Sequence, residues 1–191
     1  MAHGRKEIEV KVSLTKKEFE NVRKKVAKMA GLMRTVKQKD EYFTPPHRNF
    51  IEPKYPFEWL SVRQRGDKIK LNYKHFYPEG EEEHTHCDET EVDVKNIEEL
   101  EKMMSALNFH HLVTVEKERE VFMYGDEFEI ALDTVKDLGY FVEVEALKDF
   151  GGTLLTKNKI IAFAEKLGID ISNTDKRGYP YLLLKKKGLV K

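Results

Sequence analysis

Charged and apolar residues alternate in the segment EIEVKV, residues 7–12. Because successive side chains of a strand point to opposite faces, Glu7, Glu9 and Lys11 are expected on one face and an apolar row on the other. Glu and Lys are poor strand formers, so this composition indicates a face that binds something ionic, such as a metal ion with an anion. The alternative is an edge strand with a solvated face. Recurrence of the pattern decides between the two.

The same alternation recurs in six further segments that favour strands. Their charged faces consist of Arg63 and Arg65; Lys70, Asn72 and Lys74; Glu89, Glu91 and Asp93; Lys117 and Arg119; Glu129 and Asp133; and Glu143 and Glu145. One charged face is commonly solvated, whereas a whole set of mixed sign indicates an ionic interior. Apolar rows on the opposite faces then require helices to cover them.

Eight strands and four helices are expected around these faces. The strands are placed at residues 7–14, 39–43, 59–65, 69–75, 85–94, 113–122, 127–135 and 140–146. Two hairpin signals, Gly66-Asp67 and Tyr124-Gly125-Asp126, favour a mainly antiparallel sheet. The fold class is therefore α+β, with an eight-stranded closed antiparallel β-barrel, a charged lumen and helices packed outside.

The helices are predicted from capping patterns and apolar periodicity. Thr15 with Glu18 opens the first helix, for which Gly31 is a natural stop, and Asn96 with Glu99 opens the second. The third runs over about 156–167 with Gly168 behind it, and a short fourth begins at Pro180 and reaches 187. With 191 residues and no linker, residues 1–191 are expected to form a single domain.

Composition excludes several classes of function. The chain has 34 Lys and Arg against 34 Asp and Glu, so no net charge favours nucleic acid or a membrane surface. It has no apolar run that would span a bilayer, and its start has no signal-peptide pattern, so a cytoplasmic protein is expected. A lone Cys87 excludes an internal disulfide, in agreement with a reducing compartment. The oligomeric state stays open, with a homodimer as one option.

The two signs of charge suit two parts of one ligand. Oxygen ligands favour a hard cation such as Mg²⁺ or Mn²⁺, and Lys and Arg bind phosphate oxygens. The balanced mixture therefore indicates a metal-bound polyphosphate.

At these residues the sequence resembles the CYTH family, the triphosphate tunnel metalloenzymes that include class IV adenylyl cyclases and thiamine triphosphatases. Glu-x-Glu-x-Lys alone is a weak signal in so charged a chain, but the motifs occur in order along nearly its whole length. They are Glu7-x-Glu9-x-Lys11, Asp40-x-Tyr42-Phe43, Pro46-x-Arg48-x-Phe50, Leu60-x-x-Arg63-x-Arg65, Tyr73-Lys74, Glu89-x-Glu91, Val115-x-Lys117-x-Arg119 and the run from Leu132-Asp133 to Glu143-x-Glu145.

The resemblance implies a role for each charged group. The metal would bind to Glu7, Glu9, Glu143 and Glu145, with Asp133 near it. The triphosphate would bind to Lys11, Arg63, Arg65, Lys74, Lys117 and Arg119. The residues expected to act in catalysis are Glu7, Glu9 and Lys11. For Glu89 and Glu91 three alternatives stay open: a second metal site, an ion pair in the lumen, or a solvated pair.

The activity that the resemblance implies most directly is that of a class IV adenylyl cyclase, which converts ATP to cyclic AMP and pyrophosphate. A triphosphatase acting on tripolyphosphate, thiamine triphosphate or a nucleoside triphosphate is the alternative, and a non-catalytic polyphosphate-binding module is another. Two places depart from the family pattern: the long acidic loop 77–87, and Arg177-Gly178-Tyr179 where Arg-Ser-Tyr is common.

Two rival sites are weaker. His84, His86, Cys87 and Asp88 are possible zinc ligands, but the only other close pair is His110-His111 and the spacing is poor. Aromatic residues near the proline-rich loop 44–57 could stack on a base, although such residues more often pack against the protein. They are Tyr42, Phe43, Phe57 and Trp59.

Overall fold

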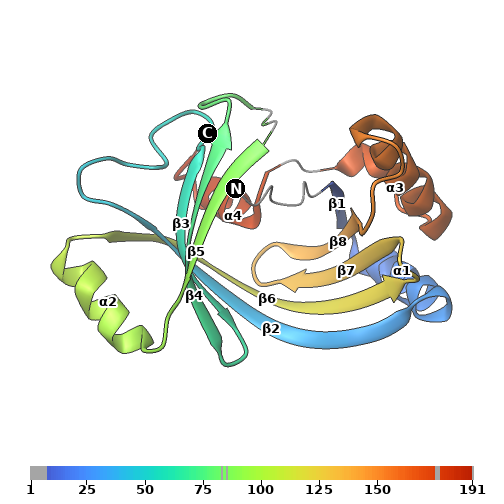
Figure 1. The fold of residues 1–191 in the computed structure, drawn as a ribbon, viewed down its shortest axis with the longest axis horizontal. Helices are drawn as coiled ribbons and strands as arrows, with labels where there is room; N and C mark the ends of the chain where they lie inside the picture. The colour runs from blue at the N-terminus through green and yellow to red at the C-terminus, as the bar shows by residue number, and fades with distance from the viewer. Residues whose placement is uncertain (1–7, 83, 85, 175–176, 191) are drawn as a thin grey trace. The chain divides into compact units, whose positions relative to one another are not determined.

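The computed structural model of the chain describes residues 8–82, 84, 86–174 and 177–190 (Figure 1). These residues form an eight-stranded antiparallel sheet and four α-helices, which confirms the α+β class. The elements are β1 (Glu9–Leu14), α1 (Lys16–Met29), β2 (Gly31–Thr44), β3 (Glu58–Arg65), β4 (Lys68–Tyr77), β5 (His86–Asp93), α2 (Ile97–Ala106), β6 (His110–Tyr124), β7 (Phe128–Val135), β8 (Gly139–Ala146), α3 (Thr153–Leu167), a 3-10 turn (Ile171–Asn173) and α4 (Tyr179–Lys186).

The strand order in the sheet is β1-β8-β7-β6-β2-β3-β4-β5. All eight predicted strands are present, most with ends within two or three residues of the prediction. The order runs from β1 to β5 and does not establish a closed barrel, so closure stays a prediction. The chain contains two compact units, a first unit of Met1–Val36 with Glu118–Lys176 and a second unit of Lys37–Lys117 with Arg177–Lys191.

The second strand is much longer than its predicted range of 39–43. The structure begins β2 at Gly31, because α1 ends at Met29 and Ala30 already has an extended backbone. Gly31 therefore starts a strand, whereas the sequence suggested it as a helix stop. The first part of β2 includes Leu32 and Met33, which are mostly exposed, so no in–out alternation marks it in the sequence.

The helix ends follow the capping signals. Thr15 and Glu18 form a reciprocal capping box, in which the Thr15 amide donates to Glu18 Oε2 at 2.7 Å and the Glu18 amide donates to Thr15 Oγ1 at 3.3 Å. The Asn96 side chain caps α2 by accepting from the amide of Glu99. Gly168 ends α3 with φ +81°, a left-handed conformation that glycine adopts without strain. These ends confirm the predicted caps.

In the first unit, α1 and α3 cover one face of β1, β8 and β7 (Figure 1). That face contributes the apolar alternate residues of the three strands, such as Val12, Val144 and Ile130. From the helices, Val26 and Ile160 are fully buried against them. This core confirms that apolar strand faces lie under helices and leaves the charged alternate residues on the opposite face.

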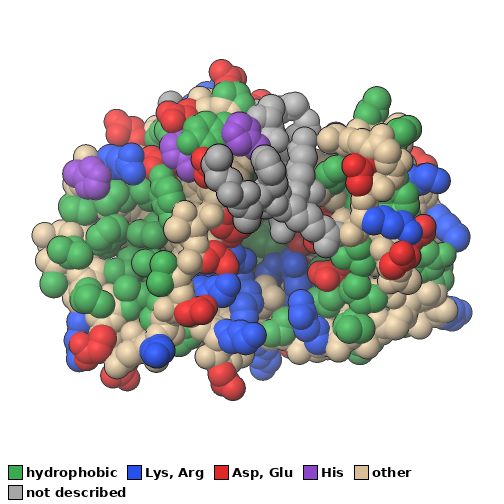
Figure 2. Space-filling view, in the orientation of Figure 1, with side chains coloured by type: hydrophobic (Ala, Val, Ile, Leu, Met, Phe, Trp, Pro, Cys, Tyr) green, Lys and Arg blue, Asp and Glu red, His purple; other side chains and the backbone are tan. Residues whose placement is uncertain are grey.

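In the second unit, β2, β3, β4 and β5 form consecutive antiparallel pairs. The helix α4 buries Tyr181 and Leu184, whereas α2 buries only Met104 among its residues. Apolar side chains stay visible at the surface of this unit (Figure 2), and Val92 and Met103 are more than half exposed. Coverage by α2 is therefore slight compared with the helices of the first unit. In the described part of the chain, no helix has the length and apolarity needed to cross a membrane.

Candidate functional site

The pairing register places the charged residues of β1, β7 and β8 on one face of the first unit. Lys11 is the direct partner of Glu143, and Glu9 is the direct partner of Glu145, which also pairs with Glu129 of β7. Direct partners in antiparallel strands share a face, so these side chains project to the side opposite α1 and α3. The strand parity predicted from the sequence is therefore confirmed.

Lys11 and Glu143 form an ion pair on this face. The distance from Lys11 Nζ to Glu143 Oε1 is 2.9 Å, and the Lys11 side chain is only 14% exposed. Burial disfavours the ammonium, but the charges of Glu143 and Glu9 outweigh it, and the pKa of Lys11 is raised. Lys11 therefore stays a cation on this face, as phosphate binding requires.

Arg119 of β6 is fixed by two carboxylates. Its Nε donates to Asp133 Oδ1 at 2.7 Å and its Nη2 donates to Asp133 Oδ2 at 2.6 Å, and it also donates to Glu143. The Asp133 side chain has no exposed surface. Bidentate contact sets the plane and direction of the guanidinium. In this geometry Asp133 orients Arg119, while its predicted place near a metal stays a prediction.

Three carboxylates form a row across this face. Glu9, Glu145 and Glu129 are cross-strand neighbours, and like charges in such positions repel. Among the described residues, no group of three or more Asp, Glu, His or Cys has the arrangement of a metal cluster, and the predicted ligand Glu7 lies outside them. Mg²⁺ is usually bound by one or two carboxylates together with substrate phosphates, so the donor atoms on this face fit that chemistry.

In the second unit, Arg65 is bound by a carboxylate that we did not assign from the sequence. Its Nη1 and Nη2 donate to the two carboxylate oxygens of Asp40 at 2.5 and 2.8 Å. Asp40 is buried and also lies 4.0 Å from Arg63, its direct partner in the register. Asp40 on the neighbouring strand β2 therefore contacts two of the three arginines of the predicted phosphate set, Arg63 and Arg65.

Glu89 and Glu91 of β5 form ion pairs with cations of β3 and β4. Arg63 Nη1 lies 3.3 Å from Glu89 and 3.1 Å from Glu91, and Lys74 Nζ lies 3.3 Å from Glu89. Lys70 binds Glu91 at 2.5 Å. The two glutamates therefore form ion pairs at exposed positions, and whether these positions line a lumen stays a prediction. Cations expected to bind phosphate are thus already in contact with carboxylate oxygens.

The amide of Asn72 links the same two glutamates. Its Nδ2 donates to Glu89 at 2.6 Å and to Glu91 at 3.2 Å. The hydrogen bond from Lys70 is the main cause of a lowered pKa at Glu91, so this carboxyl group is ionised in the folded protein. Asn72 and Lys70 share the face of Lys74, as strand parity predicted, although neither was assigned to the phosphate set.

Lys117 and Arg177 each lie over an aromatic ring of α4. The ammonium of Lys117 is 4.7 Å from the centre of the Tyr179 ring, and the guanidinium of Arg177 is 4.5 Å from that of Tyr181. Such contacts orient a cation through the ring quadrupole. The segment 177–179, which departs from the family pattern, therefore contributes directly to the surroundings of Lys117.

The aromatic residues near the proline-rich loop, for which the sequence favours packing over base stacking, contact other side chains of the second unit. Tyr42 and Trp59 pack edge to face with ring centres 5.7 Å apart, and burial raises the pKa of the Tyr42 hydroxyl. Phe43 packs on His111 and Phe57 packs on His75. These contacts agree with the packing interpretation.

The histidines of the rival zinc site stack on aromatic rings. His86 stacks on Tyr77 with ring centres 4.9 Å apart, and His84 packs against Phe76. Cys87 donates to the carbonyl of Asp88. The absence of a metal cluster among the described residues gives this alternative no support.

Known proteins that match this chain share its fold. The family model described as the CYTH domain matches residues 5–179. No curated protein matches the chain. The PH1819 protein from Pyrococcus horikoshii OT3 is 27% identical with a TM-score of 0.74, over 95% of this chain and 99% of that one.

Two further solved structures share the fold at lower identity. A candidate adenylate cyclase from Vibrio parahaemolyticus is 19% identical with a TM-score of 0.67, over 95% of this chain and 99% of that one. HpAC1 from Hippeastrum, a candidate adenylyl cyclase described with a dominant triphosphatase activity, is 14% identical with a TM-score of 0.63, over 97% of this chain and 96% of that one. These two likenesses are evidence of the fold alone.

Proposed function

The chain belongs to the CYTH family, and we propose that it is a divalent-metal-dependent enzyme that acts on a triphosphate, with the class IV adenylyl cyclase reaction as the first candidate. The observation that carries the proposal is the pairing of four cations of the charged strand faces with carboxylates, namely Lys11, Arg65, Lys74 and Arg119. The proposal is that these cations exchange their carboxylate contacts for phosphate contacts when a polyanion binds, because both kinds of contact are charge-assisted hydrogen bonds. Closure of the sheet into a tunnel is part of the proposal.

Phosphate binding is assigned to the cations of the two units. In the first unit, Lys11 and Arg119 bind phosphate oxygens while Glu143 and Asp133 keep them oriented. The second unit contributes Arg63, Arg65, Lys74 and Lys117. Arginine supplies bidentate hydrogen bonds and lysine supplies a point charge, so the set stabilises negative charge that develops on a leaving phosphate.

The carboxylates Glu9, Glu143 and Glu145, with Glu7 outside the described residues, are proposed to hold Mg²⁺ or Mn²⁺. When bound, the metal supplies charge neutralisation and polarises a phosphoryl oxygen. Glu9 is proposed to orient the nucleophile, and Lys11 to stabilise charge on the phosphates. In the cyclase reaction the ribose 3′-hydroxyl attacks the α-phosphate of ATP, a P–O bond forms, and the bond to pyrophosphate breaks.

A triphosphatase is the second candidate function. In that reaction water attacks the terminal phosphate and orthophosphate is released. HpAC1, which shares this fold, is described with a dominant triphosphatase activity, so the fold is compatible with this second reaction. Both reactions need a positioned triphosphate and stabilised charge on the leaving group. The fold does not fix whether the ribose hydroxyl or water attacks, so it does not decide between the two reactions.

Product identification tests the proposal. The protein is incubated with Mg²⁺ or Mn²⁺ and separately with ATP, thiamine triphosphate or tripolyphosphate. Cyclic AMP with pyrophosphate supports the cyclase, and orthophosphate supports the triphosphatase. Glu9→Gln is expected to abolish metal-dependent turnover while the fold is kept, and Glu20→Gln on the exposed face of α1 serves as the matched control. The absence of product from every substrate, or full activity of Glu9→Gln, would contradict the proposal.

A further inference from the structure

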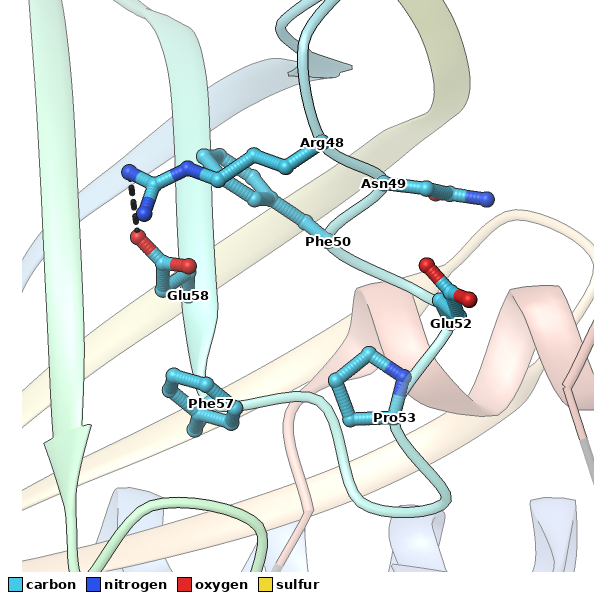
Figure 3. Close-up of a pocket in the computed structure, with 7 residues that line it drawn as sticks. All are labelled: Arg48, Asn49, Phe50, Glu52, Pro53, Phe57 and Glu58. Carbon is cyan, nitrogen blue, oxygen red and sulfur yellow. Dashed lines mark ion pairs between the residues drawn. The ribbon is translucent and has the colours of Figure 1, made fainter.

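The loop between β2 and β3 forms a half-open cavity of about 390 Å³ in the second unit (Figure 3). Its walls are Arg48, Asn49, Phe50, Glu52, Pro53, Phe57 and Glu58. The volume lies within the range of pockets that bind small molecules. None of these residues belongs to the metal or phosphate sets assigned above.

The cavity lies on the side of β3 opposite the proposed phosphate residues. Glu58 alternates with Trp59 along β3, and Trp59 has the parity of Arg63 and Arg65. Because successive side chains point to opposite faces, Glu58 projects away from the two arginines. The cavity is therefore a separate site from the one proposed for the triphosphate.

Glu58 is a buried carboxylate with one oxygen still available. It is 6% exposed, and both of its recorded polar contacts involve Oε1: Tyr73 Oη donates at 2.5 Å and Arg48 Nη2 lies at 2.8 Å. Within the described residues, no hydrogen bond reaches Oε2. Figure 3 shows the Glu58 carboxylate at the cavity wall beside Arg48. A buried acceptor with unused capacity favours a donor ligand.

The charges around the cavity favour a cation. Glu52 and Glu58 are two acids against the single base Arg48, which leaves one net negative charge. No ion pair of Glu52 is recorded within the described part of the chain, and Figure 3 shows its carboxylate on the opposite wall from Glu58. An anion would meet both carboxylates, whereas an ammonium group would bind them.

Aromatic rings complete the site. Phe50, only 5% exposed, and Phe57 form apolar walls, and Phe50 already packs under the Arg48 guanidinium at 5.2 Å. Aromatic faces combined with carboxylates recognise organic ammonium groups. From this geometry we propose that the cavity binds a small organic cation, an alkyl amine or diamine, through Glu58 Oε2 and the Glu52 carboxylate.

The loop is held in the shape that forms the cavity. Thr44 Oγ1 donates to the Arg48 carbonyl at 3.0 Å and accepts from the Phe50 amide at 2.9 Å. At the other end, the Phe76 amide donates to the Phe57 carbonyl at 2.8 Å. A site fixed in this way binds its ligand without the cost of ordering a loop.

Calorimetric titration with 1,4-diaminobutane tests the proposal, with 1,4-butanediol as the neutral compound of the same length. Saturable binding of the diamine alone is expected, and Glu52→Gln should weaken it about fivefold, the loss expected for one solvent-exposed ion pair. Glu81→Gln, an exposed acid outside the cavity, should bind like the wild type. Thermal unfolding verifies that each variant is folded.

Three results would overturn the assignment. They are no saturable diamine binding by the wild-type protein, equal weakening by Glu52→Gln and Glu81→Gln, and equal affinity for the diol. Phe57→Leu tests the aromatic wall separately, because loss of the ring should weaken diamine binding while both carboxylates stay. No triphosphate or divalent metal is present in the titration, so its outcome is independent of the proposed enzyme activity.

Discussion

Arg119 binds both carboxylate oxygens of Asp133, which has no exposed surface. Because water does not reach the Asp133 carboxylate, its negative charge is stabilised mainly by the Arg119 guanidinium. Removing one partner leaves the other charge buried and uncompensated, which costs far more than loss of an exposed ion pair. The pair therefore couples the stability of the first unit to the orientation of a proposed phosphate ligand.

Asp133→Asn should lower the free energy of unfolding by about 3 kcal/mol, because the amide leaves the Arg119 guanidinium without its bidentate partner. Denaturant unfolding followed by circular dichroism measures the change. Asp126→Asn is the matched control, since Asp126 is 85% exposed and pairs with Lys148 at the surface. The control should lose less than about 1 kcal/mol. Equal losses for the two variants would contradict the role assigned to the buried pair.

Glu91→Gln should strengthen binding of tripolyphosphate measured without metal. Glu91 occupies Arg63 and Lys70, and a neutral amide would release both cations to the ligand. The expected gain is about fivefold in affinity, equivalent to ~1 kcal/mol for a half-exposed ion pair. Isothermal titration measures it, and Glu81→Gln controls for the change of net charge. Weaker binding by Glu91→Gln would instead indicate that Glu91 positions the cations for phosphate.

The stability contributed by Glu91 should disappear in acid. Its pKa is lowered chiefly by the hydrogen bond from Lys70, so the ionised form stabilises the fold above the ordinary value of 4.5, and that contribution is lost as the pH falls through the lowered pKa. The difference in unfolding free energy between wild type and Glu91→Gln should therefore be largest at neutral pH and shrink below 4.5. A difference that grows in acid would contradict this assignment.

Side-chain parity made the sheet and much of the candidate site predictable. Alternation fixes which residues share a face, so Lys11 and Glu143 could be placed together once both segments were expected to be strands. Register between distant strands is a tertiary property, and the partners Asp40 of Arg65 and Glu129 of Glu145 therefore escaped assignment.

The rest of the fold depends on features without a sequence period. The first residues of β2 do not alternate, and the cavity at Glu58 is formed by a loop whose shape is set by hydrogen bonds of Thr44. Cap residues such as Gly168 act locally and were predictable, whereas these contacts depend on the folded chain.

Glu129→Gln should raise stability in the absence of a divalent metal and should reduce the stabilisation that the metal gives. Glu129 is the direct partner of Glu145, which in turn pairs with Glu9, so three carboxylates repel one another across the strands. With EDTA present, the amide should raise the free energy of unfolding by up to about 1 kcal/mol, because one like charge is removed from the row. Mg²⁺ or Mn²⁺ should stabilise the wild type more than the variant, since binding to the folded state alone raises its stability.

Thermal unfolding of both proteins across a metal titration measures these two effects, and Glu127→Gln at the neighbouring turn is the control. A destabilised variant in EDTA would show that Glu129 makes a net favourable contact in the row. Equal stabilisation of variant and wild type by metal would limit the metal ligands to the carboxylates of β1 and β8. A smaller metal effect in the variant would extend the proposed site to β7. Salt screens distant charges, so only a carboxylate close to the bound metal ion changes the affinity of the protein for that ion substantially.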